Sequence, residues 1–182
     1  MAFPGTYNFS YYRGDTYEFI IQPKNSLGGA FDLSGYTAEF NVATARGGAL
    51  ATTAAYASGG ASGASTVVIS AANTAITVGQ RVTGTGIDTN TAVTGVSGTT
   101  ITLSKVTTAQ VSGTLSFYNQ YVCTASVNTT TDTVTCTIAP SVGRSFIGGT
   151  AYVYDVQISD GTKIFTILNG TITVTNDITG AA

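Results

Sequence analysis

The sequence of 182 residues contains no histidine, only two cysteines and three prolines, and few charged side chains. Without histidine, the Ser–His and Cys–His catalytic pairs are impossible. A zinc site would need more ligands than two cysteines supply. The Gly-rich segments lack the following lysine and helix that a phosphate-binding loop requires. We therefore expect no enzyme, no bound metal or other cofactor, and no small-molecule ligand.

Charged residues make up 9% of the chain, against about 25% in an average soluble domain. This low charge indicates that much of the surface faces other protein. The net charge is −2 and no basic run is present, so nucleic acid is not expected as a partner. No window approaches 18 continuous apolar residues, so no membrane span is expected, and the N-terminus lacks signal-peptide features.

Cys123 and Cys136 flank a hairpin-like segment built around NTTTD. Pairing of its two strands could bring the sulfurs close together. Two interpretations remain open, a pair of small buried thiols or one cross-strand disulfide. The missing secretion signal favours free thiols.

What the sequence has in abundance is strand-forming residues. Runs of Val, Ile, Thr, Tyr and Phe are separated by Gly, Asn, Asp or Ser, and no window shows a helical apolar repeat. Short strands at regular spacing predict an all-β fold, an immunoglobulin-like β-sandwich with a small β domain inserted in one loop. The expected strands are 17–23, 36–43, 66–71, 80–87, 91–98, 99–104, 113–127, 132–139, 150–160, 163–170 and 171–177.

Composition changes in the middle of the chain. Residues 49–65 are low in complexity and are expected to form a flexible linker. Residues 66–118 contain few charges and are expected to form the inserted domain. The aromatic and charged pattern of 1–48 returns in 119–182, and these two segments are expected to form one discontinuous host sandwich.

Several turns can be located from their residues. Asp160-Gly161 and Asn169-Gly170 each lie between strand patterns and are expected to form tight hairpins, as is Ser97-Gly98. Gly14-Asp15 belongs to Arg13-Gly14-Asp15, a tripeptide that adhesive proteins offer to cell receptors. A short motif counts only in its structural context, so we interpret it as the turn before strand 17–21.

Aromatic residues crowd the N-terminus. Tyr17, Phe19 and Ile21 share one face of their strand and are expected in the core. The preceding segment, 2–12, is expected to be an arm that contacts a neighbouring subunit, because aromatic side chains are favoured at interface centres. The possible contact residues are Phe3, Tyr7, Phe9, Tyr11 and Tyr12.

Two sets of motifs resemble domains of known proteins. The stretch YYRGDTYEF, the segment DLSGYTAEF and the strand GTAYVYDVQISDG resemble the N-terminal immunoglobulin-like domain of phage upper baseplate proteins, which docks receptor-binding machinery onto the tail. The segments VGQRVTGTGI and TTITLS resemble a small β module of phage fibre and tail proteins. The baseplate pattern accepts Lys or Arg at position 13. Arg13→Lys is therefore expected to be nearly silent, whereas a bulky residue at Gly14 is expected to harm folding.

The resemblance implies a non-enzymatic structural component of a tailed-phage virion, assembled in the bacterial host cytoplasm. Its implied partners are other virion proteins and copies of itself. The expected location is the tail, baseplate or neck. The alternatives are a head decoration or cement protein on the capsid exterior, and a host-glycan-binding fibre or adhesin module.

Overall fold

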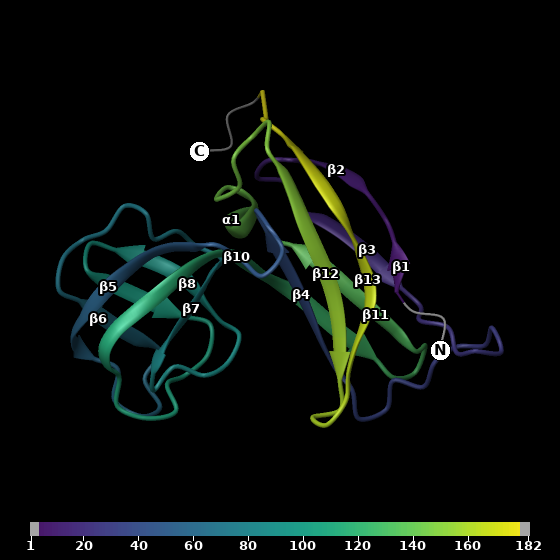
Figure 1. Ribbon diagram of the computed structural model, residues 1–182, viewed down its shortest axis with the longest axis horizontal. Helices are drawn as coiled ribbons and strands as arrows, with labels where there is room; N and C mark the ends of the chain where they lie inside the picture. The colour runs from purple at the N-terminus through teal and green to yellow at the C-terminus, as the bar shows by residue number, and fades with distance from the viewer. Residues whose placement is uncertain (1–3, 179–182) are drawn as a thin grey trace. The chain divides into compact units, whose positions relative to one another are not determined.

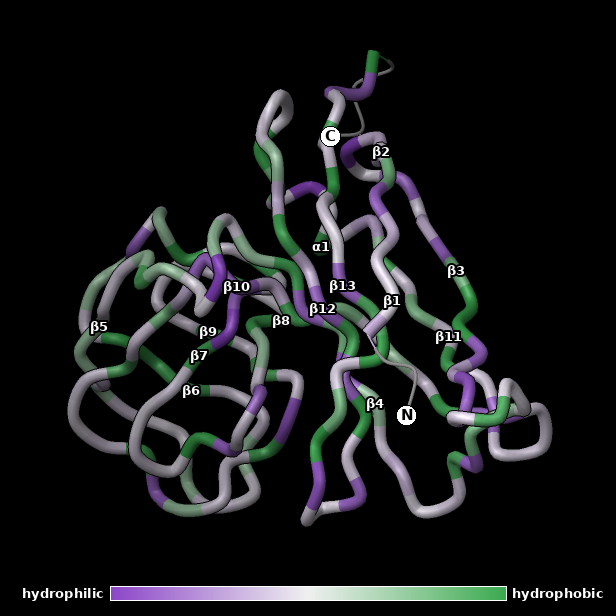
Figure 2. Tube along the Cα trace, turned by 45° about the vertical axis from the view of Figure 1, so that its right-hand side comes forward, coloured by the Kyte–Doolittle hydropathy of each residue, from purple (hydrophilic) through white to green (hydrophobic). Residues whose placement is uncertain are grey.

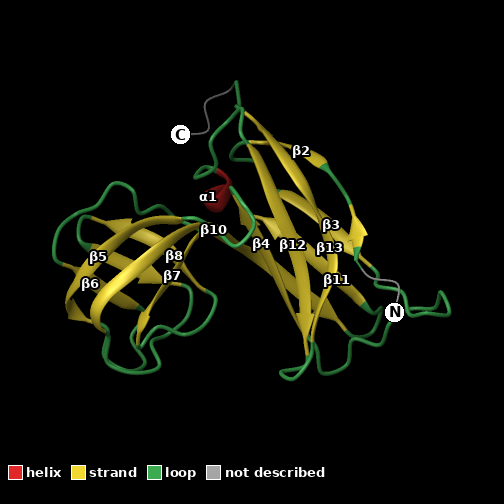
Figure 3. Ribbon diagram, viewed as in Figure 1, coloured by secondary structure: helices red, strands yellow, loops and turns green. Residues whose placement is uncertain are grey.

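The computed structural model describes residues 4–178. The chain folds as two units, one formed by residues up to Val42 together with those from Cys123 onward, the other by Ala43–Val122. Strands make up nearly all the regular structure, with a single four-residue helix, α1 (Pro140–Gly143), in the described residues (Figures 1 and 3). The predicted all-β, sandwich-like fold is confirmed.

The first unit consists of two sheets. One has the order β13-β12-β4, and β4 pairs in turn with β10. At the other side of this sheet, β1 and β2 both pair parallel to β13 (Figure 1). The other has the order β3-β11-β10 and uses the second half of β10. This order is that of an immunoglobulin-like sandwich. Strands β3, β11 and β10 correspond to B, E and D, and strands β4, β12 and β13 correspond to C, F and G. The strands are β1 (Gly5–Thr6), β2 (Phe9–Tyr12), β3 (Tyr17–Ile21), β4 (Thr37–Ala43), β10 (Ser112–Asn128), β11 (Thr133–Ile138), β12 (Ala151–Ser159) and β13 (Ile164–Thr175).

Three aromatic rings connect the two sheets. Phe19 on β3 lies 5.5 Å from Phe40 on β4 and 6.2 Å from Tyr154 on β12, between ring centroids. Phe40 and Tyr154 are 5.7 Å apart, and the three pairs meet edge to face. These strands correspond to B, C and F, where antibody domains place a disulfide against a tryptophan. The rings therefore occupy the positions of that Cys–Trp–Cys core.

The corner before β12 has a second immunoglobulin-like feature. The hydroxyl of Tyr152, the second residue of β12, accepts a hydrogen bond from the backbone N–H of Ile147 at 2.8 Å. Tyr152 is fully buried, and its ring lies 4.9 Å from that of Phe146. A tyrosine at the start of strand F that bonds backbone a few residues upstream is the tyrosine corner of such sandwiches.

The second unit is a closed barrel of six antiparallel strands. Its order is β10-β5-β6-β9-β8-β7, and β7 pairs in turn with β10. Closure leaves no strand edge of this ring unpaired, which removes the usual site of edge-to-edge association. The further strands are β5 (Leu50–Gly59), β6 (Thr66–Ile69), β7 (Gln80–Thr85), β8 (Thr91–Ser97) and β9 (Thr100–Leu103).

The barrel core is aliphatic, with one aromatic ring. Buried and less buried residues alternate along β6, β7 and β9, the pattern of a sheet with one buried face. Hydrophobic stretches, drawn in green, recur along the barrel in Figure 2. Phe117 is the single aromatic residue in the buried cluster. The other members of that cluster are Val67, Ile69, Ile76, Val82, Val93, Ile101, Leu103, Val111 and Leu115.

Two sequence predictions are wrong. The expected linker, 49–65, contains strand β5, which pairs with β10 and β6 and is part of the barrel wall. Small residues there allow close packing, so low complexity did not indicate flexibility. The expected hairpin at Asn169-Gly170 lies inside the continuous strand β13, opposite Asp155 and Tyr154.

Two other hairpins are where they were expected. Asp160 and Gly161 connect β12 to β13, with Gly161 at φ +86°. Gly98 connects β8 to β9 at φ +58°. Both glycines adopt left-handed conformations that other residues rarely take.

Gly170 is required for a close approach rather than for a turn. A Cβ at this position would lie 1.9 Å from the backbone oxygen of Tyr7 and 2.9 Å from the Tyr154 ring. Because backbone cannot move aside as a side-chain tip can, we expect Gly170→Ala to lower the free energy of unfolding by about 1–3 kcal/mol. Urea unfolding followed by circular dichroism measures this change in the free energy of unfolding. Gly95→Ala is the matched control, since a Cβ there would meet only the Thr102 side chain at 3.3 Å. Equal stability of both variants would contradict the close approach.

Candidate functional site

The N-terminal aromatic segment is the predicted contact site, and the structure divides it. Phe9 is 9% exposed and Tyr11 is 1% exposed, so both lie in the core of the first unit. The prediction that they contact another subunit is wrong, because β2 joins the sheet and turns them inward. Tyr7 and Tyr12 are 47% and 57% exposed and stay available for contact. Phe3 lies outside the described residues.

Phe9 and Tyr11 are held by specific neighbours. The Phe9 ring stacks on Tyr17 with centroids 4.4 Å apart. The Tyr11 hydroxyl donates to the backbone oxygen of Asp15 at 2.7 Å. Burial raises the pKa of Tyr11 to about 12. Gly143 in α1 leaves room for this ring, since a Cβ there would overlap the Tyr11 hydroxyl.

Tyr7 stands at the border between the core and the surface. Its backbone oxygen accepts a hydrogen bond from the Tyr154 hydroxyl at 2.7 Å. Its own hydroxyl lies 3.5 Å from that of Tyr17. Burial, followed by this tyrosine pair, raises the pKa of Tyr17 to about 12. The N-terminal strand is therefore tied to the sandwich rather than free to act as an arm.

The predicted turn at Gly14 and Asp15 is confirmed. The N–H of Asp15 donates to the backbone oxygen of Tyr12 at 3.1 Å, and Gly14 has φ +89°. The turn moves the chain from the β13 sheet, where β2 lies, to the β11 sheet, where β3 lies. It is a corner between the two layers of the sandwich.

Arg13 has a role that the sequence did not reveal. Its Nε donates to the backbone oxygens of Arg144 and Phe146 at 3.0 and 2.9 Å, and Nη2 donates to that of Arg144 at 2.6 Å. The guanidinium therefore fastens the corner to the loop after α1. A guanidinium committed to backbone carbonyls does not fit the receptor-binding use of Arg-Gly-Asp. The planar fork of arginine makes this contact, so Arg13→Lys is no longer expected to be silent.

The acidic side chains are used as turn caps. Asp160 Oδ1 accepts the N–H groups of Thr162 and Lys163 at 2.9 and 2.7 Å, and these bonds hold its pKa below the ordinary value. Asp32 Oδ1 accepts the N–H of Ser34 at 2.8 Å, with the same effect on its pKa. Carboxylates held in this way fix loops, and their ionised form is the stabilised one.

Within residues 4–178, no group of three or more His, Cys, Asp or Glu side chains is placed to hold a metal ion. No helix in the same range is long and apolar enough to cross a membrane.

Both cysteines are buried and free. Cys136 stands opposite Ala125 in the β10–β11 ladder, so Cys123 lies two residues along β10 from that position, on the same face of the sheet. Such diagonal neighbours have Cα atoms about 7–8 Å apart, beyond the usual span of a disulfide. Burial raises the pKa of both thiols, that of Cys136 to about 12. The register thus favours the thiol alternative.

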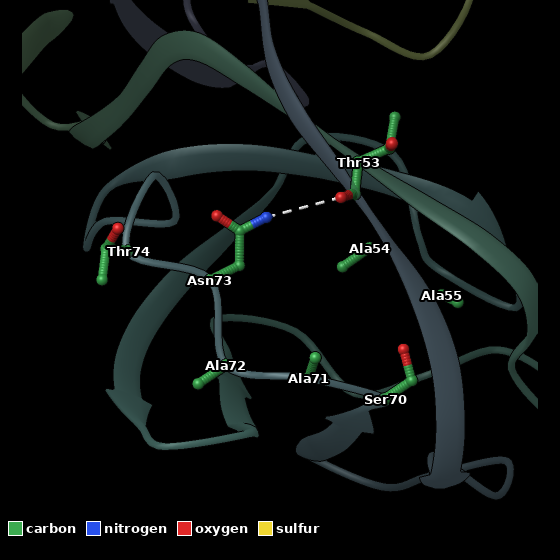
Figure 4. A pocket seen from close by; sticks show the side chains of 8 residues that line it. All are labelled: Thr53, Ala54, Ala55, Ser70, Ala71, Ala72, Asn73 and Thr74. Atoms are coloured by element: carbon green, nitrogen blue, oxygen red, sulfur yellow. Dashed lines mark hydrogen bonds between the residues drawn. The ribbon is translucent and has the colours of Figure 1, made fainter.

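A shallow depression of about 340 Å³ lies on the barrel, between β5 and the segment that follows β6 (Figure 4). Asn73 closes one side, where its Nδ2 donates to Thr52 Oγ1 at 2.9 Å and to the Thr53 backbone oxygen at 3.4 Å. Small uncharged side chains make up its lining, which provides no acid or base. The lining residues are Thr53, Ala54, Ala55, Ser70, Ala71, Ala72, Asn73 and Thr74.

Comparison with known proteins identified no family. No protein-family model matches the sequence, and no curated protein matches it. One solved structure with a weak match is a family 123 glycoside hydrolase from Clostridium perfringens, reported in a study of glycolipid glycan hydrolysis. The match covers 95% of this chain and 23% of that chain, at 11% identity and a TM-score of 0.29. A similarity this low carries no argument about fold or activity.

The Gly14 corner can be tested with two substitutions. Gly14→Val places a β-branched residue at φ +89°, which we expect to cost about 1–3 kcal/mol of unfolding free energy. Arg13→Lys loses the fork, which we expect to cost about 1 kcal/mol. Urea unfolding measures both, and Arg46→Lys on an exposed loop is the control. If Arg13→Lys matches this control, the guanidinium contact does not stabilise the corner.

Proposed function

We propose that this chain is a non-enzymatic structural component of a tailed-phage particle that acts by packing against other virion proteins. The motifs that resemble phage baseplate and fibre domains are the basis of the proposal. The observation that carries it on the structural side is the use of the polar side chains. Asp32 and Asp160 hold turns and Arg13 holds a corner through hydrogen bonds to the backbone. These three charged side chains therefore stabilise local structure.

The surface of the first unit is suited to such packing. Large apolar side chains stand exposed on several of its strands and loops. Exposed apolar side chains at aromatic-rich positions are what protein interfaces use as anchors. The exposed set is Tyr7, Tyr12, Ile20, Leu27, Ile147, Ile164 and Ile178.

The proposed position is the tail, baseplate or neck, because the host sandwich resembles a docking domain. A decoration protein on the capsid exterior is the alternative within the same class. A glycan-binding role for the inserted barrel has less support. Sugar sites use aromatic faces, and residues 66–116 contain no aromatic residue. The tyrosines that β5 and β10 add to the barrel are engaged within it, since the Tyr56 hydroxyl donates to the Gly59 backbone oxygen and Arg81 covers the Tyr118 ring.

Labelling of purified virions with antibody against this chain tests the proposal. We expect gold particles at the tail, baseplate or neck in electron micrographs. Pre-immune serum provides the background. Staining confined to the head would move the protein to capsid decoration. Absence of the chain from particles, by both labelling and mass spectrometry, would overturn the proposed function.

A further inference from the structure

The outer edge of β3 has no strand partner among residues 4–178, since β3 pairs with β11 alone. Several other strand edges are paired, among them that of β4, which pairs with β10. The edge of β13 is covered by the short strands β1 and β2, and the barrel closes on itself. An open strand edge presents unpaired N–H and C=O groups and is a template for pairing with another chain.

The residues of β3 favour pairing of this edge with another chain. Tyr17, Phe19 and Ile21 are half-buried, whereas Glu18 and Ile20 face outward. Ile20 is 64% exposed. Natural edge strands usually carry charged residues, above all lysine, or proline or a bulge as protection. Between Tyr17 and Ile21, β3 has no lysine, proline or bulge, and its single charge is that of Glu18. An apolar side chain at the centre of an unprotected edge indicates an interface.

We propose that a second copy of this chain pairs with β3 in antiparallel orientation, about a two-fold axis at Ile20. The two Ile20 side chains would then oppose each other and cover their exposed surface. Phe19 would stand opposite Ile21, and Glu18 opposite Gln22. A two-fold contact of this kind uses the same patch on both copies.

Charge complementarity selects both the second copy and this register. Lys24 Nζ donates to Gln22 Oε1 at 2.8 Å, so a cation lies beside the residue that Glu18 of the other copy would face. The pairing therefore brings opposite charges together twice. A register centred on Phe19 would instead set Glu18 against the exposed Ile20 and leave both without a suitable partner.

The contact is small, because β3 has five residues. Interfaces below about 1,200 Å² are weak, so the dimer is concentration-dependent and gains strength where many copies are held together. The inference stands apart from the proposed function. Self-association is measured on the purified chain, whereas the virion role is measured on particles.

Ile20→Cys tests the register directly. Two opposed cysteines at the axis would form an intermolecular disulfide under mild oxidation, and the dimer would appear on a non-reducing gel. The native cysteines are buried and do not compete. Ile164→Cys is the matched control, since Ile164 is also a strand residue and is 67% exposed. Cross-linking of Ile20→Cys no faster than of Ile164→Cys would overturn the proposal.

Sedimentation of the unmodified chain tests the association itself. We expect a monomer–dimer equilibrium, weakened at least tenfold by Ile20→Lys and unchanged by Ile164→Lys. Circular dichroism checks that both variants are folded. A chain that remains monomeric at every concentration, or an unchanged dimer in Ile20→Lys, would contradict pairing through β3. Capture of a different chain by β3 without self-association would also overturn it.

Discussion

The edge-to-face contact of Phe19, Phe40 and Tyr154 is the interaction on which the first unit depends. It joins strands of both sheets where antibody domains have a disulfide and a tryptophan. Ring pairs in this geometry contribute about 0.5–1.5 kcal/mol beyond the area they bury. Phe9 and Tyr17 extend the cluster toward the N-terminal strand, and Phe9 also contacts Phe19 and Tyr154.

The two units solve the problem of strand edges in different ways. The barrel closes through the β7–β10 pair and buries an almost purely aliphatic core. The sandwich covers the β13 edge with short strands but leaves β3 open. Tight backbone approaches support the covered edge, as Gly170 beneath the Tyr7 carbonyl illustrates. If the molecule associates through strands, the sandwich is the unit that permits it.

Local sequence patterns predicted much of this fold, but they could not predict which distant segments pair. Alternation identified β3, β4, β12 and the all-β class, and the turn residues located Gly14, Gly98 and Gly161. Sequence could not show that β1 and β2 pair with β13, about 160 residues away, so Phe9 and Tyr11 were misread as contacts. The same cause explains Gly170, whose neighbour Tyr7 is distant in sequence, and Arg13, whose carbonyl partners follow α1. The prediction of a linker at 49–65 was wrong because small residues are as compatible with a barrel wall as with a linker.

The structural role proposed for the chain requires a rigid sandwich, and that rigidity is attributed to the aromatic contact between its sheets. A double-mutant cycle on Phe40→Leu and Tyr154→Leu, measured by urea unfolding, tests this most directly. The account predicts a coupling free energy of about 1 kcal/mol between the two positions. Strictly additive effects of the two substitutions would show that the rings act as independent core residues, and would contradict it.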